Sequence, residues 1–473
     1  MTTSPLRVGP SRARLGLDAV LRGLGRFVLR VFFRDIDVQG ATNFPTKGPV
    51  IVVANHANSL IDGVLIASFL PRFPRMLTAS TVWHNTAVIP FLTAAGAIPV
   101  YRQAEVGRAT ARAKNRFSVV WDELARHHVI AIFPEGISHD HPYLLPVKSG
   151  TARIALEAEL QRGPLGVQIL PIGLEFENKT RFRSRAVMRI GAALSITEEA
   201  ERYATAEAAQ RQTAVRDVTA RIGAALQTVT SSFASWDEAR LLGRAAEIWA
   251  RPQSALPTDP PLPDKLARRR AFADGYAWLQ NAFPDRAQGL RQRLQDYDRE
   301  MRRAGLRDAQ IGATYPLSRV AGYVMMSLMM MAVWLPISII GTLLNVVPYL
   351  VARAIAWGKD RDKIATWAVF SSVFVFPLFW GVQALAARQC VTWSGTFIDG
   401  QTVGWLTLLA APLAGAASLP FHDIRSRFWR EVRGWTILRL RPDLSRRLSA
   451  ERRGIHTELS DIVALYRAET ETT

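Results

Sequence analysis

Residues 49–63 read PVIVVANHANSLIDG, and this stretch decides the fold class of the region around it. The run 50–54 contains four β-branched residues and an alanine, which is typical of a buried β-strand. The run ends in a polar turn that holds His56 and Asp62, with five residues between them. Functional side chains of α/β sheets gather where buried strands end in such turns. The stretch therefore predicts an α/β domain with a site here, although such a pair is also compatible with a purely structural turn.

An α/β pattern of sequence continues to about residue 195. Short β-rich runs alternate with helical stretches, as expected of an α/β fold. We expect strands over 50–54, 98–101, 129–133, 167–173 and 186–190, and helices over 108–126 and 151–160. The sequence thus predicts a domain over 45–200 in which helices flank a mixed sheet.

The charge of the chain calls for an anionic partner. It has 59 Lys and Arg against 40 Asp and Glu, a formal net charge of +19, and arginine carries most of the positive charge. Nucleic acid and an anionic membrane surface would both satisfy this charge. The sequence holds no recognisable reading helix or zinc finger, so we expect no nucleic acid partner. The single cysteine, Cys390, lies in an apolar region and excludes both a disulfide framework and cysteine catalysis.

Residues 1–44 are predicted to be an amphipathic, basic N-terminal helix region. Apolar residues recur with a period near 3.6 over 15–34, while Arg22, Arg26, Arg30 and Arg34 repeat every four residues on another face. Arginines interrupt the apolar part, which excludes a signal peptide. Two interpretations remain open: a helix in a membrane interface with its arginines toward lipid phosphates, or a surface helix packed on its own domain.

A helical extension is expected over 201–315, interrupted by a proline-rich linker at 251–264. Membrane segments follow over 316–422. No charged residue occurs between Arg319 and Arg353, between Lys363 and Arg388, or between Asp399 and Asp423. Each stretch is long enough to cross a hydrocarbon core, which takes about 20 helical residues.

The charges between the apolar stretches predict their topology. The connector 353–363 and the tail 423–473 are basic, which favours the cytoplasmic side for both. For the catalytic domain to be cytoplasmic as well, the first stretch must return to its starting face. We therefore expect a re-entrant or bent hairpin over about 320–352, broken at its prolines and glycine, and full crossings at 364–387 and 401–421.

Four blocks occur in one order along the α/β region. They are NHANSLID (55–62), GAIPVYR (96–102), FPEGIS (133–138) and ILPIGL (169–174), and each follows or overlaps a predicted strand. In these blocks the sequence resembles the glycerolipid acyltransferase family, which acylates glycerol-3-phosphate, dihydroxyacetone phosphate or lysophosphatidate. The five-residue spacing between His56 and Asp62 departs from the usual four. It resembles the subgroup that includes the fungal glycerol-3-phosphate/dihydroxyacetone phosphate acyltransferases, whose members also carry a helical extension and C-terminal membrane segments.

Acyl transfer from a thioester to an alcohol requires removal of the hydroxyl proton during attack, and a neutral imidazole suits this role at physiological pH. The resemblance makes His56 the general base and Asp62 the group that orients its ring. It also implies an acceptor pocket made by Arg102, Glu135, Gly136 and Ser138, with Glu135 bonded to a glycerol hydroxyl.

Lys148 stands just before the helix expected at 151–160, where a cation beside helix amides would favour a phosphate. Arg102 offers a planar fork that suits phosphate oxygens. Pro171, in the fourth block, is expected to shape the acyl side of the cleft or to be a structural turn residue. His139 and His141 invite a metal reading, but no carboxylate or cysteine cluster completes a site, so we expect no metal and no cofactor.

The sequence thus predicts an integral membrane acyltransferase of phospholipid synthesis, with its catalytic domain on the cytoplasmic face. The expected acceptor is glycerol-3-phosphate, with lysophosphatidate or dihydroxyacetone phosphate as alternatives, and the acyl donor is acyl-CoA or acyl carrier protein. A non-catalytic scaffold that binds anionic lipid is the alternative from a different class.

Overall fold

A computed structural model describes residues 12–84, 86, 88–100, 117–251, 260–312, 317–394, 397 and 399–471. The chain forms two compact units. Unit 1 contains residues 1–232 together with 358–366, and unit 2 contains residues 233–357 and 367–473.

Unit 1 is built on an eight-stranded mixed sheet, which confirms the predicted fold class. The strand order is β1-β7-β6-β2-β5-β3-β4, and β8 pairs with β6. Strands β2, β3, β4 and β5 are parallel to their neighbours, whereas β6 is antiparallel to β7 and β8. The strands are β1 Phe33–Gln39, β2 Val50–Ala54, β3 Pro74–Ala79, β4 Ile98–Val100, β5 Val129–Ile132, β6 Gln168–Phe176, β7 Ser184–Ile190 and β8 Leu194–Ser195.

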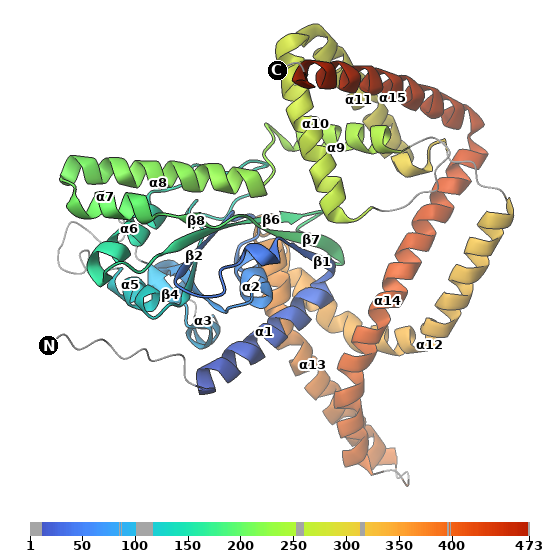
Figure 1. The fold of residues 1–473 in the computed structure, drawn as a ribbon. Helices are drawn as coiled ribbons and strands as arrows, with labels where there is room; N and C mark the ends of the chain where they lie inside the picture. The colour runs from blue at the N-terminus through green and yellow to red at the C-terminus, as the bar shows by residue number, and fades with distance from the viewer. Residues whose placement is uncertain are drawn as a thin grey trace. The chain divides into compact units, whose positions relative to one another are not determined.

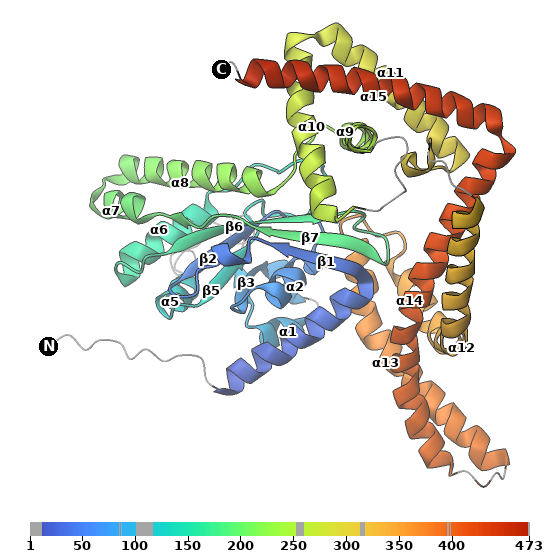
Figure 2. The same ribbon diagram turned by 45° about the vertical axis from the view of Figure 1, so that its right-hand side comes forward.

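Helices cover both faces of this sheet, so unit 1 has three layers; α8 lies over one face, and α1 and α2 lie over the other (Figures 1 and 2). Ile51 and Val53 of β2 pack into a core with α5, α6 and α8, and the intervening strand residues face the opposite layer. The helices are α1 Arg12–Phe32, α2 Leu60–Phe69, α3 Ile89–Ala95, α5 Ser118–Ala125, α6 Gly150–Arg162, α7 Thr197–Thr205 and α8 Ala208–Val229, with 3₁₀ helices at Ala41–Asn43 and Ser80–His84.

The boundaries of this unit differ from the prediction of a domain over 45–200. Strand β1 lies within the predicted N-terminal region 1–44, and α8 and the second half of α7 lie within the predicted extension. Both parts pack on the sheet: β1 pairs with β7, and Val218 and Leu226 of α8 belong to the main core. Strand β1 and helix α8 are therefore parts of unit 1.

The structure combines the two interpretations of the N-terminal helix. Arg26 donates to the carbonyl oxygen of Ser68 at 2.8 Å, and Arg22 donates to that of Pro71 at 3.4 Å. These two arginines therefore bond the domain itself, as the interpretation of a surface helix packed on its own domain predicts. Another face of α1 exposes four large apolar residues: Leu17, Val20, Leu24 and Phe27. The apolar face, not the arginine face, is the one left open.

Unit 2 is helical. Its helices are α9 Trp236–Ala250, α10 Leu262–Ala282, α11 Pro284–Ala304, α12 Leu317–Ala356, α13 Ile364–Ser394, α14 Gly400–Leu440 and α15 Pro442–Glu471, with a 3₁₀ helix at Asp308–Gln310; the first residues of α13, up to Thr366, belong to unit 1. Of the predicted proline-rich linker, residues 252–259 lie outside the described residues, and α10 begins within its last part.

The predicted separation of the tail 423–473 from the helical extension is a second correction. Helix α14 continues without interruption past residue 422, and α15 packs against α9, α10 and α11. Leu448, Ile455 and Leu459 of α15 share one core with Leu241 and Leu290 of the extension. The tail is basic, but its apolar residues recur at helical spacing and bury against the extension.

Three helices, Val320–Ala356, Ile364–Ser394 and Gly400–Leu440, are long and apolar enough to cross a membrane. The first is one hydrogen-bonded helix with Pro336 and Pro348 inside it, so the expected break into two helices is not seen, although α12 is visibly bent (Figures 1 and 2). Whether this helix returns to its starting face stays a prediction. Asn345 joins the apolar helices, since its Nδ2 donates to the Ala411 carbonyl at 3.0 Å and its Oδ1 accepts from Trp380 at 2.9 Å.

Candidate active site

The register of two parallel strands brings His56 and Glu135 together. Val53 of β2 pairs with Ile132 of β5. His56 lies three positions after Val53, and Glu135 lies three positions after Ile132. The backbone N–H of His56 donates to Oε1 of Glu135 at 2.7 Å. The backbone N–H of His139 in turn donates to the His56 carbonyl at 3.1 Å. The first and third sequence blocks therefore meet at the carboxyl edge of the sheet, where α/β proteins place their sites.

His56 and Asp62 form a close pair. Nδ1 of His56 lies 3.0 Å from Oδ2 of Asp62, and the imidazole ring stacks on Phe133 with a centroid separation of 3.9 Å. An ionised carboxylate can only accept, so Nδ1 carries the proton and Nε2 keeps its lone pair. The Asp62 side chain is fully buried, whereas that of His56 is 19% exposed. This arrangement leaves a basic nitrogen accessible and its ring orientation fixed.

Asp62 is held in place by the start of α2. It stands in the first turn of this helix, and its Oδ2 also accepts from the backbone N–H of Asn58 at 2.7 Å. Negative charge is favoured at a helix N-terminus. The turn before the helix contains Ser59 in an unusual backbone conformation, with φ +48°, and its N–H donates to Ser138 Oγ at 3.1 Å. The five-residue spacer is therefore a constrained turn that returns Asp62 to His56.

Glu135 connects two loops. Its side chain is fully buried, and besides the His56 N–H it accepts from the backbone N–H of Leu145 at 2.8 Å and from Nε2 of His139 at 2.5 Å. Nδ1 of His139 accepts from the backbone N–H of His141, so the proton of that ring lies on Nε2 and is donated to Glu135. Both carboxylate oxygens are engaged by the protein. The structure thus gives Glu135 partners other than the predicted glycerol hydroxyl, and that contact stays a prediction.

Gly136 and Lys148 lie against each other beside this loop. The backbone N–H of Lys148 donates to the Pro134 carbonyl at 2.9 Å, and its side chain crosses Gly136 so closely that a Cβ there would be 2.6 Å from Nζ. Gly136 also has φ +76°, a conformation that favours glycine. Residue 148 stands two positions before α6. Its role in binding a phosphate beside the helix amides stays a prediction.

The structure therefore brings six of the seven predicted site residues into one cluster: His56, Asp62, Glu135, Gly136, Ser138 and Lys148. The seventh, Arg102, lies outside the described residues, two positions beyond the end of β4. Pro171 is not in a turn; it lies buried in β6 opposite Val53. The described residues contain no group of three or more metal-ligating side chains, and His139 is engaged with Glu135 and His141.

Sequence reasoning missed the residues that support the turn from outside. Nζ of Lys179 donates to the Ala57 carbonyl at 2.7 Å and to the His139 carbonyl at 3.3 Å, and it pairs with Asp140 at 2.7 Å. A lysine shortly after a strand gives no sign of this role, because its partners lie about 40 and 120 positions away.

The segment 358–366, which follows α12 and includes the first turn of α13, also supports the turn. Thr366 Oγ1 donates to the Asn58 carbonyl at 3.3 Å, and Arg361 pairs with Asp140 at 3.4 Å. Through these contacts a segment far away in sequence belongs to unit 1.

The comparisons with known proteins agree with this geometry. Residues 35–175 match the family model described as acyltransferase, and residues 252–470 match the model of the glycerol-3-phosphate acyltransferase 2 C-terminal domain. The first match spans the strand ends that carry the cluster, and the second spans most of unit 2. The two matches confirm the resemblance predicted from the four sequence blocks.

Relatives in fungi match more than half of the chain. An uncharacterised acyltransferase of Schizosaccharomyces pombe is 25% identical over 91% of this chain and 78% of its own length. In Saccharomyces cerevisiae, glycerol-3-phosphate O-acyltransferase 1 is 23% identical over 74% of this chain, and glycerol-3-phosphate O-acyltransferase 2 is 27% identical over 56% of it. The matches span 47% and 37% of the lengths of these two enzymes.

Proposed function

We propose that this chain, an O-acyltransferase of the glycerolipid acyltransferase family, transfers a fatty acyl group from an acyl thioester to the hydroxyl of glycerol-3-phosphate. The observation that carries the chemical part of the proposal is the 3.0 Å pair between His56 and Asp62 at the carboxyl edge of the sheet. The choice of acceptor is supported by the C-terminal match and by the names of the two Saccharomyces cerevisiae relatives.

In the proposed reaction, Nε2 of His56 takes the proton of the acceptor hydroxyl while the hydroxyl oxygen bonds to the thioester carbonyl carbon. The carbon–sulfur bond then breaks, and the imidazolium returns the proton to the leaving thiolate. An ester and a thiol are formed, and His56 is neutral again. Asp62 stabilises the imidazolium and keeps the proton of the neutral ring on Nδ1. The acceptor itself attacks, so no serine or cysteine nucleophile takes part.

The acceptor phosphate is proposed to bind at Lys148, beside the N-terminus of α6, with Arg102 as a second cation. Gly136 supports this placement, because its missing side chain lets the lysine lie across the loop. Ser138 is held near His56 by the N–H of Ser59 and completes the proposed acceptor side of the site. The acyl donor is proposed to be acyl-CoA or acyl carrier protein.

We place the protein in a membrane with its catalytic unit on the cytoplasmic face. Three apolar helices support membrane association, and the basic segments 353–363 and 423–473 favour the cytoplasmic side. The exposed apolar face of α1 gives the catalytic unit a surface that suits the lipid interface.

The test is acyl transfer in membranes that contain the full chain. Radiolabelled glycerol-3-phosphate, dihydroxyacetone phosphate and lysophosphatidate are each supplied with palmitoyl-CoA, and wild type is compared with His56→Ala. The exposed His84, changed to alanine, is the matched control. We expect label to move from glycerol-3-phosphate into lysophosphatidate with wild type and His84→Ala, but not with His56→Ala.

Other outcomes would replace the proposal. Acylation of lysophosphatidate or dihydroxyacetone phosphate alone would assign a different acceptor, and undiminished transfer by His56→Ala would remove the proposed base. Binding to anionic vesicles without transfer to any of the three acceptors, from palmitoyl-CoA or from palmitoyl carrier protein, would favour the scaffold.

A further inference from the structure

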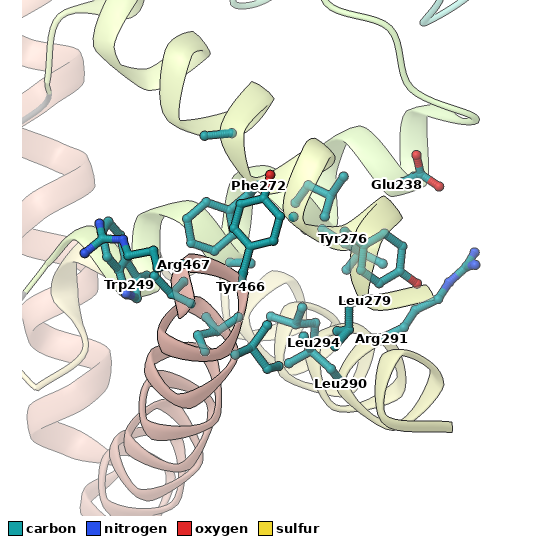
Figure 3. Close-up of a pocket in the computed structure, with 18 residues that line it drawn as sticks. Glu238, Trp249, Phe272, Tyr276, Leu279, Leu290, Arg291, Leu294, Tyr466 and Arg467 are labelled. Atoms are coloured by element: carbon teal, nitrogen blue, oxygen red, sulfur yellow. The ribbon is translucent and has the colours of Figure 1, made fainter. Parts of the chain in front are cut away.

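Unit 2 contains a partly open apolar cavity that the proposed reaction does not use. Helices α9, α10, α11 and α15 surround about 220 Å³ (Figure 3). Of the residues that line the cavity, only Glu238, Arg291 and Arg467 are charged. The aromatic rings of Phe272, Tyr276 and Tyr466 and the leucines of α10 and α11 face it (Figure 3). An apolar lining of this kind favours an apolar ligand.

The charges at the cavity favour an anion. Arg291 and Arg467 lie on opposite sides of the apolar lining (Figure 3). The carboxylate of Glu238 accepts from the backbone N–H of Ala234 at 3.1 Å, so this acid is used at the start of α9. Two guanidinium groups therefore flank an apolar interior. A ligand with an apolar chain and an anionic head satisfies both features.

We propose that this cavity binds the chain of a long-chain acyl anion, with the anionic head at one of the two arginines. A free fatty acid and a lysophosphatidate share this chemistry. The site is separate from the His56 cluster, because the cavity is made entirely by residues of unit 2. The choice of an acyl compound over other apolar anions rests on the proposed function, since the reaction consumes and produces acyl compounds.

The size of the cavity limits what it can hold. A group the size of a water molecule takes up about 30 Å³, so 220 Å³ holds roughly seven such groups, or about as many methylenes. Each methylene that enters is expected to tighten binding about fourfold. Affinity should therefore rise with chain length from the shortest acids and level off once about seven or eight methylenes are buried.

Two glycines of unit 2 supply a matched pair of variants. Gly275 lines the cavity from α10, and a Cβ added there meets nothing within 4 Å. Gly289 of α11 has the same free space but lies outside the lining. Gly275→Leu therefore extends a leucine side chain from an unobstructed Cβ at the cavity wall, whereas Gly289→Leu adds the same side chain elsewhere. Both changes raise helix propensity, so neither is expected to unfold the unit.

The experiment uses the full chain in lipid nanodiscs and a photoreactive palmitate with a diazirine in its chain. We expect labelled peptides from α10 and α15, a loss of at least fivefold in this labelling with Gly275→Leu, and no loss with Gly289→Leu. Labelling of the apolar helices α12, α13 and α14 by palmitate in the bilayer is the internal standard. Equal labelling of α10 and α15 in the two variants, or none in wild type, would overturn the proposal.

Competition separates the sources of the ligand. Unlabelled palmitate and 1-palmitoyl lysophosphatidate are each tested as competitors of the photoreactive palmitate. Glycerol-3-phosphate, which has no chain, is expected not to compete with it. Arg291→Gln with Arg467→Gln should weaken both anionic competitors but leave neutral monopalmitoylglycerol unaffected; equal effects on all three would remove the anionic head from the proposal. All binding is repeated with His56→Ala. Labelling that survives in this variant, or in a protein that transfers no acyl group, separates this site from the proposed reaction.

Discussion

The backbone N–H of His56 donates a 2.7 Å hydrogen bond to Oε1 of Glu135. The side chain that follows β5 therefore holds the backbone that follows the neighbouring strand β2. The same carboxylate accepts from Leu145 and His139 on the adjoining loop. Three donors therefore converge on a group that is fully buried. The position of the proposed base depends on a neighbour that need not touch the substrate.

Glu135→Gln is expected to lower kcat by about 10- to 100-fold, because small misplacements of a reacting group have effects of this size. A glutamine has one accepting oxygen and presents its NH₂ to a donor, so at least one buried N–H loses its partner at a cost of about 1–3 kcal/mol. Initial rates and thermal unfolding of the purified variant measure the two effects. Glu123→Gln is the matched control, since Glu123 also bonds a histidine, His128, away from the site. Unchanged rates for Glu135→Gln would show that the hydrogen bonds accepted by Glu135 are not needed to position His56.

Asp62→Asn is expected to reduce kcat by about 10³- to 10⁴-fold with little change in KM, by analogy with other histidine–aspartate pairs. Both His56 Nδ1 and the backbone N–H of Asn58 donate to the same oxygen, Oδ2, of Asp62. An amide lacks the negative charge that stabilises the imidazolium, and its NH₂ can donate to Nδ1, so the ring loses its fixed tautomer. Steady-state kinetics with varied acceptor concentration separates the two parameters. Asp122→Asn, which removes an exposed ion pair with Arg162, should leave both unchanged. A change confined to KM would assign Asp62 to substrate binding instead.

Lys179→Met is expected to lower activity about 10-fold by releasing the turn between His56 and Asp62. The ammonium group donates to the carbonyls of Ala57 and His139, and charged hydrogen bonds of this kind contribute about 1.5–3 kcal/mol. Asp140→Asn should produce a smaller loss, because it weakens the ion pairs of Asp140 with Lys179 and Arg361 but leaves the hydrogen bonds of the lysine to the Ala57 and His139 carbonyls in place. Transfer rates in membranes are compared with those of Lys47→Met, an exposed lysine. Full activity of Lys179→Met would contradict the assigned support.

Tyr203 should make unit 1 less stable at alkaline pH. Burial, with the 2.5 Å hydrogen bond from its hydroxyl to Glu157, raises the pKa of Tyr203 to about 12. An unfolded tyrosine ionises near pH 10, so this stabilisation is complete below about pH 10 and is lost as the pH rises toward 12. Unfolding temperatures at pH 9 and 11.5 should therefore fall less steeply for Tyr203→Phe than for wild type. Tyr143→Phe, at an exposed tyrosine, should follow wild type; parallel slopes for all three proteins would refute the linkage.

The elements that sequence predicted best are those whose pattern is local. The run 50–54 became strand β2 with the same bounds, because β-branched residues pack well in a central parallel strand. Strand β3 was missed, since two prolines and two arginines at 71–75 resemble a turn. The guanidinium group of Arg75 is buried there because Asp18 of α1 pairs with it at 3.1 and 3.2 Å. A partner 57 positions away leaves no local sign.

In the site, too, local features were predictable from the sequence and features that depend on distant partners were not. The spacing of His56 and Asp62 predicted their pairing, because a short turn before a helix must bring the two side chains back together. The partners of Glu135 could not be foreseen, since they depend on the register of β2 against β5 and on the path of the loop to Leu145. The roles of Lys179 and Thr366 depend on contacts over more than 100 positions, and their own neighbourhoods carry no motif.

The segment 358–366 makes the catalytic unit discontinuous along the chain. The polypeptide leaves this unit after residue 232, passes through the helices up to α12, and returns to place Arg361 against Asp140 and Thr366 against the Asn58 carbonyl. A truncated protein that ends at residue 232 would therefore lack the contacts that Arg361 and Thr366 make with the catalytic unit. A faithful soluble version has to be spliced, with the returning segment grafted back as an insert or supplied as a peptide.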